Sequence, residues 1–138
     1  ITNASRTLLY DIGKRAWSDE MCTLFRAPRA LLPEVRACDD AFGEADATHF
    51  GRAIPISGAA GDQQAALYGH GCLKPGMAKA TFGTGAFLVM NMGTSPPRSS
   101  NRLLATVGYQ TKDALAFALE GSIFSAGATM QWLRDGLK

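Results

Sequence analysis

Two pairs of strand-like segments in the second half of the chain constrain the fold more than any other feature. The pattern is strand-like at 77–82 and 86–92, around the turn Gly83-Thr84-Gly85, and again at 103–109 and 114–119. Short turns between such segments are typical of antiparallel hairpins. A helical pattern follows from about residue 125. We therefore predict an antiparallel meander of two hairpins covered by a helix on one face, an arrangement that serves many functions.

The first half of the chain has helix and loop patterns instead. Ser18 is placed to cap a helix that runs to about Arg26, because serine is a preferred N-cap residue. The segment 39–53 is polar and contains glycine, so we predict a loop or a short strand there. The turn signal Lys74-Pro75-Gly76, after which the strand pattern begins, is the candidate domain boundary.

Composition excludes several classes of protein. A hydrophobic share of 46% with 19% charged residues is typical of a globular protein, and a net charge of +2 without a basic stripe does not indicate nucleic-acid binding. The longest apolar run, 86–90, is too short for a membrane-spanning helix. Neither a disulfide framework nor a metal site is indicated, and we expect buried free thiols in the cytoplasm. The residues concerned are Cys22, Cys38, Cys72, His49 and His70.

The strongest local signal is the run Gly58-Ala59-Ala60-Gly61-Asp62-Gln63-Gln64, which follows a predicted apolar strand at 54–58. Its glycines permit a tight turn between this strand and a helix predicted at 62–70. The positive end of the helix dipole favours an ionised carboxylate at Asp62. Such a carboxylate can accept the proton of a substrate hydroxyl during phosphoryl transfer. The alternative, which spacing alone favours, is that Asp62 only caps its helix.

The second signal is the turn Gly83-Thr84-Gly85 itself. With glycine on both sides of a hydroxyl, backbone N–H groups can approach phosphate oxygens closely. An ordinary hairpin turn is the simpler interpretation. The run matches neither the G-x-G-x-x-G fingerprint nor the P-loop, so the two standard nucleotide motifs are absent from the sequence.

The third signal is a run of small residues at 121–128, just before the last helix. Gln131 follows Gly127 by four positions and so shares its helical face. Small residues let a flat adenine or ribose lie against backbone, and a helix N-terminus suits an anion. Close packing of a helix on a sheet explains the same residues equally well.

Taken together, these stretches resemble the FGGY-type carbohydrate kinases, a family of sugar and polyol kinases, and within it the members that phosphorylate glycerol. The matching runs cover nearly the whole chain in order. They are Thr2-Asn3-Ala4-Ser5-Arg6-Thr7, 32–36, 54–58, 61–67, 76–79, 83–85, 90–91, 118–121, 126–128 and 131–135. The resemblance implies an α/β fold of the actin-like (ribonuclease H-like) ATPase type. It also implies ATP-dependent phosphorylation of glycerol to glycerol 3-phosphate, with Mg²⁺ as cofactor.

The resemblance assigns roles that spacing alone does not. It makes Asp62 the catalytic base, Gln63 a hydrogen-bonding partner of the substrate, and Phe87 a contact to the carbon edge of glycerol. The residues that it places along the transferred phosphate and the nucleotide are Thr84, Gly85, Gly127 and Gln131. It gives no protein side chain the role of metal ligand, and we expect a homo-oligomer for the full-length protein.

The family is built from two domains that meet near the middle of the chain. Residues 1–70 resemble the end of the first, substrate-side domain, and 71–138 the start of the second, nucleotide-side domain. Asp62 and Thr84 are then expected to face each other across a cleft. Residue 1 is Ile, and we expect an internal piece of a longer protein that is inactive by itself.

The segment 47–53 departs from one family pattern. Members inhibited by fructose 1,6-bisphosphate carry a Gly-rich loop that ends in Thr-Arg before the Ile-Pro-Ile strand. Here the glycines are mostly replaced and Arg52 stands one place early. We therefore expect weak inhibition or none.

Two other functions stay open. One is a kinase of the same family with another sugar or polyol as substrate, because one fold permits many substrates. The other is an actin-like nucleotide-binding protein without kinase activity, which needs no ionised Asp62 beside a substrate pocket.

Overall fold

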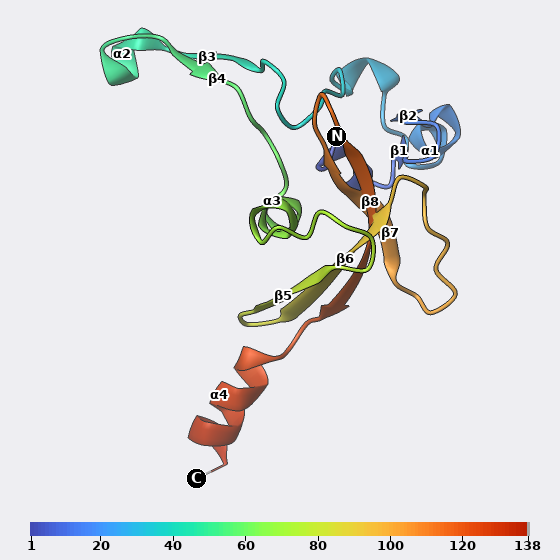
Figure 1. Ribbon diagram of the computed structural model, residues 1–138, viewed down its shortest axis with the longest axis vertical. Coiled ribbons are helices and arrows are strands. Elements are labelled where there is room, and N and C mark those ends of the chain that lie inside the picture. Colours follow the sequence, from blue (N-terminus) through green and yellow to red (C-terminus); the bar gives the residue numbers. More distant parts are fainter. Residues whose placement is uncertain (138) are drawn as a thin grey trace.

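A four-stranded antiparallel sheet lies at the centre of the computed structural model, which describes residues 1–137. The strands follow the order β5-β6-β8-β7 across the sheet (Figure 1). Their bounds are β5 (Ala78–Phe82), β6 (Ala86–Gly93), β7 (Leu104–Gln110) and β8 (Leu115–Ile123). Both predicted hairpins form, since β5 pairs with β6 and β7 pairs with β8.

The predicted meander is wrong, because β6 pairs with β8 and not with β7. The connection at 94–103 carries the chain to the far edge of the sheet, and β8 then returns between β6 and β7. A connection of this length easily spans the roughly 10 Å of two strand spacings. In the central position β8 satisfies backbone groups of both neighbours, and its small residues Ala116 and Ala118 are buried.

The helix that covers the sheet is α3 (Asp62–Gly69), which confirms the helix predicted at 62–70. Its Leu67 is fully buried and forms the core with Cys72, Val89 and Ala118. The sheet admits this helix closely at Gly108, where an added Cβ would lie 3.1 Å from Leu67 Cδ2. The last helix, α4 (Gly127–Gly136), instead extends away from the sheet and covers neither face (Figure 1).

Short elements precede the sheet. They are η1 (Ala4–Arg6), β1 (Tyr10–Asp11), β2 (Ala16–Trp17), α1 (Asp19–Leu24) and η2 (Arg29–Leu31). The predicted cap of α1 is confirmed, because Ser18 Oγ accepts a hydrogen bond of 3.2 Å from the backbone N–H of Met21. The pairing of β1 with β2 was not predicted, since two-residue strands leave no periodic pattern.

A hairpin of β3 (Gly43–Ala45) and β4 (Ile54–Ile56) projects from the body of the molecule, with α2 (Ala47–Phe50) at its tip (Figure 1). The segment 39–53, predicted as a loop or a short strand, thus contains the strand β3 and the helix α2, of which the helix was not predicted. The Asp46 carboxylate starts α2 by accepting from the backbone N–H and the hydroxyl of Thr48, at 2.8 and 2.7 Å. Gly51 ends the helix with a φ of 72°, a conformation that suits glycine.

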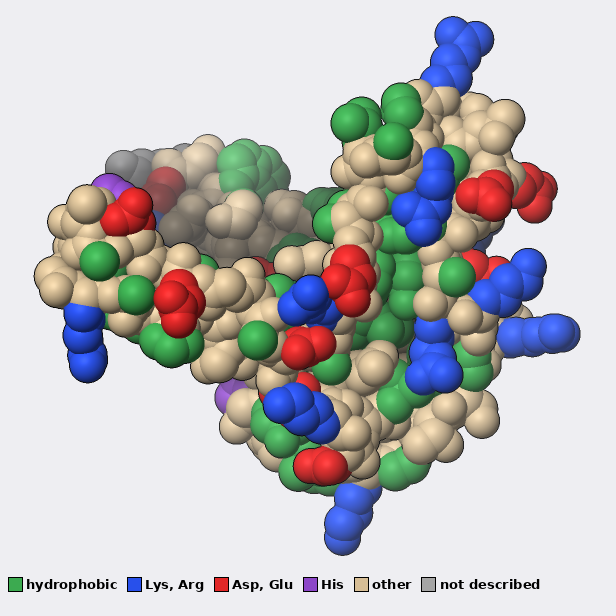
Figure 2. All heavy atoms as spheres, turned by 90° about the horizontal axis from the view of Figure 1, so that it is seen from above, with side chains coloured by type: hydrophobic (Ala, Val, Ile, Leu, Met, Phe, Trp, Pro, Cys, Tyr) green, Lys and Arg blue, Asp and Glu red, His purple; other side chains and the backbone are tan. Residues whose placement is uncertain are grey.

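The three cysteines are free thiols, of which Cys22 and Cys72 are buried and Cys38 is half-buried. Lys and Arg side chains are interleaved with Asp and Glu on the face seen in Figure 2, rather than gathered by sign. Within residues 1–137, no helix has the length and apolar character needed to cross a membrane.

Candidate active site

The start of α3 presents Asp62 to solvent. Gly61 is the N-cap residue, Asp62 is the first helical residue, and no side chain caps the helix. The carboxylate accepts a 2.7 Å hydrogen bond from the backbone N–H of Gln63. Gly61 N–H donates to the hydroxyl of the buried Thr2 at 2.9 Å, which anchors this turn on the N-terminal segment. Asp62 is therefore exposed and held at the positive end of a helix.

The sheet beneath this turn has a polar end. Val89 packs against α3, so residues on the same face of the sheet can be read from the strand register, because side chains alternate between the two faces. Lys79 lies opposite Val89, and Thr81 lies opposite Phe87. On the other side of β6, Glu120 and Ser122 lie opposite the same two residues, Val89 and Phe87. Asp62 and Gln63 are the first two residues of α3, which lies over this face of the sheet.

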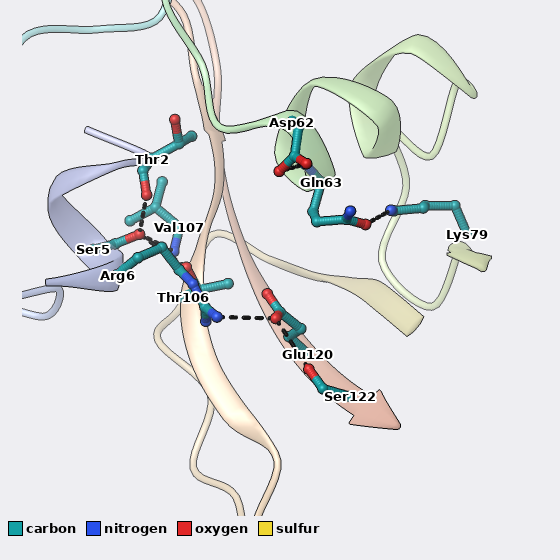
Figure 3. A network of polar contacts seen from close by, with 10 residues as sticks. All are labelled: Thr2, Ser5, Arg6, Asp62, Gln63, Lys79, Thr106, Val107, Glu120 and Ser122. Atoms are coloured by element: carbon teal, nitrogen blue, oxygen red, sulfur yellow. Dashed lines mark hydrogen bonds and ion pairs between the residues drawn. The ribbon is translucent and has the colours of Figure 1, made fainter. Parts of the chain in front are cut away.

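Lys79 ties the sheet to the helix. Its side chain is only 5% exposed, and its Nζ donates to Gln63 Oε1 and, at 2.7 Å, to Thr81 Oγ1 (Figure 3). Burial lowers the pKa of Lys79, and the negative charges of Asp62 and Glu120 partly oppose this effect. A buried ammonium group thus holds one end of the Gln63 amide.

Glu120 is a second buried charged residue on this face of the sheet. It is 3% exposed, and its Oε1 accepts from Arg6 Nη2 at 3.0 Å and from Ser122 Oγ at 3.4 Å. Arg6 comes from η1 and crosses to β8, as Figure 3 shows. Next to this ion pair, the hydroxyl groups of Ser5 and Thr106 lie 2.8 Å apart. The N-terminal segment and the sheet therefore form one polar surface.

The turn at Thr84 is fastened to the start of α4. Backbone N–H groups of Ala126 and Ala128 donate to Thr84 O at 2.8 and 3.2 Å, and that of Gly127 donates to Gly83 O at 2.9 Å. Two of the three glycines at this junction, Gly85 and Gly127, have no room for a side chain. A Cβ at Gly85 would lie 2.6 Å from Ile123 O, and one at Gly127 would overlap Gly83 O.

The predicted site residues thus form two groups. Asp62, Gln63 and Phe87 belong to α3 and the sheet face that it covers, whereas Thr84, Gly85 and Gly127 meet at the junction of hairpin and helix. Gln131 lies on α4, exposed, one turn beyond Gly127. Within residues 1–137, no hydrogen bond or ion pair links Asp62 to Thr84, so their arrangement across a cleft stays a prediction.

Sequence reasoning missed Lys79, Glu120 and Arg6 as parts of the site. A signal was present for two of them, because Lys79 and Glu120 interrupt otherwise apolar strands. Arg6 gave no such signal. Among the described residues, no three His, Cys, Asp or Glu side chains gather as metal ligands would.

Comparisons with known proteins agree in one family. Residues 1–69, half of the chain, match the N-terminal domain of the FGGY family of carbohydrate kinases. Proteins named glycerol kinase from Xanthobacter autotrophicus and Rhizobium meliloti are 58% and 57% identical over 137 residues. Glycerol kinase 1 of Pseudomonas aeruginosa is 55% identical. Each comparison covers 99% of this chain, which spans only 28% of the relative's length.

Solved structures give the same result for the fold. A xyloylose kinase from Brucella ovis superposes with a TM-score of 0.72 at 25% identity, over 87% of this chain and 25% of that one. A xylulose kinase from Rhodospirillum rubrum has the same TM-score at 22% identity, over 91% and 26%. These neighbours confirm the predicted α/β fold of the actin-like type. The chain belongs to the FGGY family of carbohydrate kinases.

Proposed function

We propose that this chain is part of a kinase that transfers the γ-phosphoryl group of ATP to glycerol, giving glycerol 3-phosphate. The observation that carries the proposal is the exposed Asp62 carboxylate at the first turn of α3, beside Gln63 and above a polar sheet face. The names of relatives at 55–58% identity support glycerol as the substrate.

In the proposed reaction, a hydroxyl oxygen of the substrate attacks the γ-phosphorus while the bond to the leaving oxygen of ADP breaks. The hydroxyl proton passes to the carboxylate of Asp62. The protein forms no covalent bond to the phosphoryl group in this reaction. The contribution of the base is therefore to orient the hydroxyl and accept its proton. Phe87 is proposed to contact the carbon edge of the substrate on the same face of the sheet as Thr81 and Ser122.

The hairpin junction is proposed as the nucleotide end of the site. Backbone N–H groups of the turn at Thr84 and Gly85 suit phosphate oxygens, and Gly127 and Gln131 follow on α4, which continues away from the turn. Mg²⁺ in such sites is held by one or two carboxylates together with the phosphates of the substrate. No carboxylate of this chain is proposed for that role, because Asp62 is the proposed proton acceptor and no cluster of metal ligands lies among the described residues. The ion would supply charge neutralisation at the phosphates.

Residues 1–70 are proposed to end the substrate-side domain and 71–138 to begin the nucleotide-side domain. The contact of α3 with the sheet and the ion pair of Arg6 with Glu120 then cross this boundary, which supports a cleft floor built from both parts. We further propose a cytoplasmic homo-oligomer for the full-length protein.

The proposed function is tested with the full-length protein, ATP and Mg²⁺ against a panel of polyols and sugars. Preference for glycerol in kcat/KM is the expected outcome. The structural neighbours named xyloylose kinase and xylulose kinase make xylulose the most informative competitor. A higher kcat/KM for xylulose than for glycerol would contradict glycerol as the substrate. Nucleotide binding without transfer to any acceptor would indicate a protein that is not a kinase.

A further inference from the structure

Lys79 is a buried cation without a carboxylate of its own. None of the ion pairs within residues 1–137 includes it, and its two hydrogen-bond acceptors, Gln63 Oε1 and Thr81 Oγ1, are neutral. The burial of a lysine with 5% exposure costs folding free energy. Its position in β5 is therefore unfavourable for stability, and we look to the contacts of its ammonium group for a role in function. Its nearest elements are α3 above and the neighbouring strand β6.

The contact with Gln63 decides which way the amide of that residue points. An ammonium group has three donors and no acceptor, so only the carbonyl oxygen Oε1 can face Lys79. The other end of the amide, Nε2, carries two N–H donors and has no protein acceptor within the described residues. Without Lys79, rotation about the last bond of the side chain could exchange the two ends at little cost.

Asp62 and Gln63 begin the same helical turn, and Figure 3 shows both side chains hanging from it. One offers an acceptor and the other, with its oxygen engaged, offers a donor. A substrate with two neighbouring hydroxyl groups satisfies both, because the reacting hydroxyl donates its proton to Asp62 while the next hydroxyl oxygen accepts from Gln63 Nε2.

We infer that Lys79 is a positioning residue, which holds the Gln63 amide with Nε2 toward the substrate and so selects substrates with vicinal hydroxyl groups. This inference rests on the proposed function of the same site. Asp62 and Glu120 are the carboxylates that face Lys79, from α3 and β8, and Cys72 is the remaining titratable neighbour.

The experiment measures KM and kcat for glycerol in the full-length protein with Lys79→Met, Gln63→Ala and the double variant. Methionine keeps the length of the lysine and removes its donors. Loss of one hydrogen bond to a neutral substrate group predicts an increase in KM of about three- to tenfold for either single variant, with a smaller change in kcat. If Lys79 acts through Gln63, the double variant is no worse than Gln63→Ala alone.

Two further variants separate positioning from packing. Thr81→Val removes the other acceptor of Lys79 and leaves the contact with Gln63. KM for glycerol should therefore stay within about twofold of the wild type, a smaller change than the loss of one hydrogen bond produces. Gln63→Glu keeps a partner for Lys79 and raises the thermal midpoint or leaves it unchanged. It nevertheless increases KM for glycerol, because its side chain has no N–H donor.

The inference is overturned if Lys79→Met keeps the wild-type KM, if the effects of Lys79→Met and Gln63→Ala multiply in the double variant, or if Gln63→Glu binds glycerol normally. Normal glycerol binding by Gln63→Glu overturns the inference even if Lys79→Met fails to fold, because the donor that Lys79 is inferred to position is then not needed. A wild-type protein that phosphorylates no polyol contradicts the proposed function instead. The two failures are therefore distinguishable.

Discussion

Substitution of Gly127 by alanine tests the junction between the hairpin turn and α4. The added Cβ would overlap the carbonyl oxygen of Gly83 and lie 3.2 Å from its carbonyl carbon. Three backbone hydrogen bonds, of 2.8, 2.9 and 3.2 Å, hold the turn on the first residues of α4 at this point. The methyl group can be accommodated only if the turn and the helix move apart by roughly 1 Å. At that separation these bonds are too long to persist.

The expected cost follows from these bonds. A net contribution of about 0.5–1.5 kcal/mol for each bond gives about 1.5–4.5 kcal/mol for three. Alanine is favoured over glycine by about 1 kcal/mol inside a helix, and because Gly127 is the first residue of α4 this preference offsets only part of the loss. The net cost is therefore about 2 kcal/mol. Because the proposed nucleotide end of the site needs the closed junction, ATP binding must restore it at this cost, and since about 1.4 kcal/mol corresponds to a tenfold change in affinity, we expect KM for ATP to rise about tenfold or more.

The assay is steady-state kinetics of the full-length protein with ATP and glycerol varied separately. KM for ATP should increase while KM for glycerol changes little. Gly69→Ala is the matched control, because Gly69 also lies in a helix and, apart from its chain neighbours and the backbone of that helix, no described atom lies within 4 Å of an added Cβ. A Gly127→Ala protein with wild-type KM for ATP and an unchanged thermal midpoint would refute the reasoning.

Three other predictions concern the base, the buried lysine and control. Asp62→Asn in the full-length protein should lower kcat by about a hundredfold or more while leaving ATP affinity nearly unchanged, and retention of a tenth of the rate contradicts the role of base. Because burial lowers the pKa of Lys79, the unfolded state binds more protons between that lowered value and the ordinary lysine value. Stability should therefore rise with pH in this window. Denaturant unfolding at alkaline pH should show this rise in the wild type and not in Lys79→Met. Fructose 1,6-bisphosphate should inhibit weakly or not at all, and strong inhibition that Arg52→Ala removes would show the opposite.

Local patterns in the sequence predict most of the individual elements. The helix at α3 and the strands of both hairpins follow from hydrophobic periodicity and turn residues, and the cap at Ser18 follows from the preference of serine for that position. The four-residue helix α2 escaped prediction, because its start depends on the side chain of Asp46 rather than on any periodic pattern.

The order of the strands and the composition of the site depend on contacts that no local pattern encodes. Strand β8 lies between β6 and β7, and the long connection before β7 allows this order. The alternation of apolar and polar residues along β8 would be the same in a meander, so it does not distinguish the two orders. The contact of Lys79 with Gln63 joins residues that are 16 positions apart, and that of Arg6 with Glu120 joins residues 114 positions apart. Spacing along the chain cannot show that such residues meet.

The attachment of the N-terminal segment to the sheet has a consequence for synthesis of the protein on the ribosome. Ser5 and Arg6 are made before their partners Thr106 and Glu120, which follow 101 and 114 positions later. At about 5–20 residues per second, Arg6 waits on the order of 6–23 s before Glu120 has been added to the nascent chain. The segment that contains Ser5 and Arg6 therefore reaches its final place only after β8 has emerged from the ribosome.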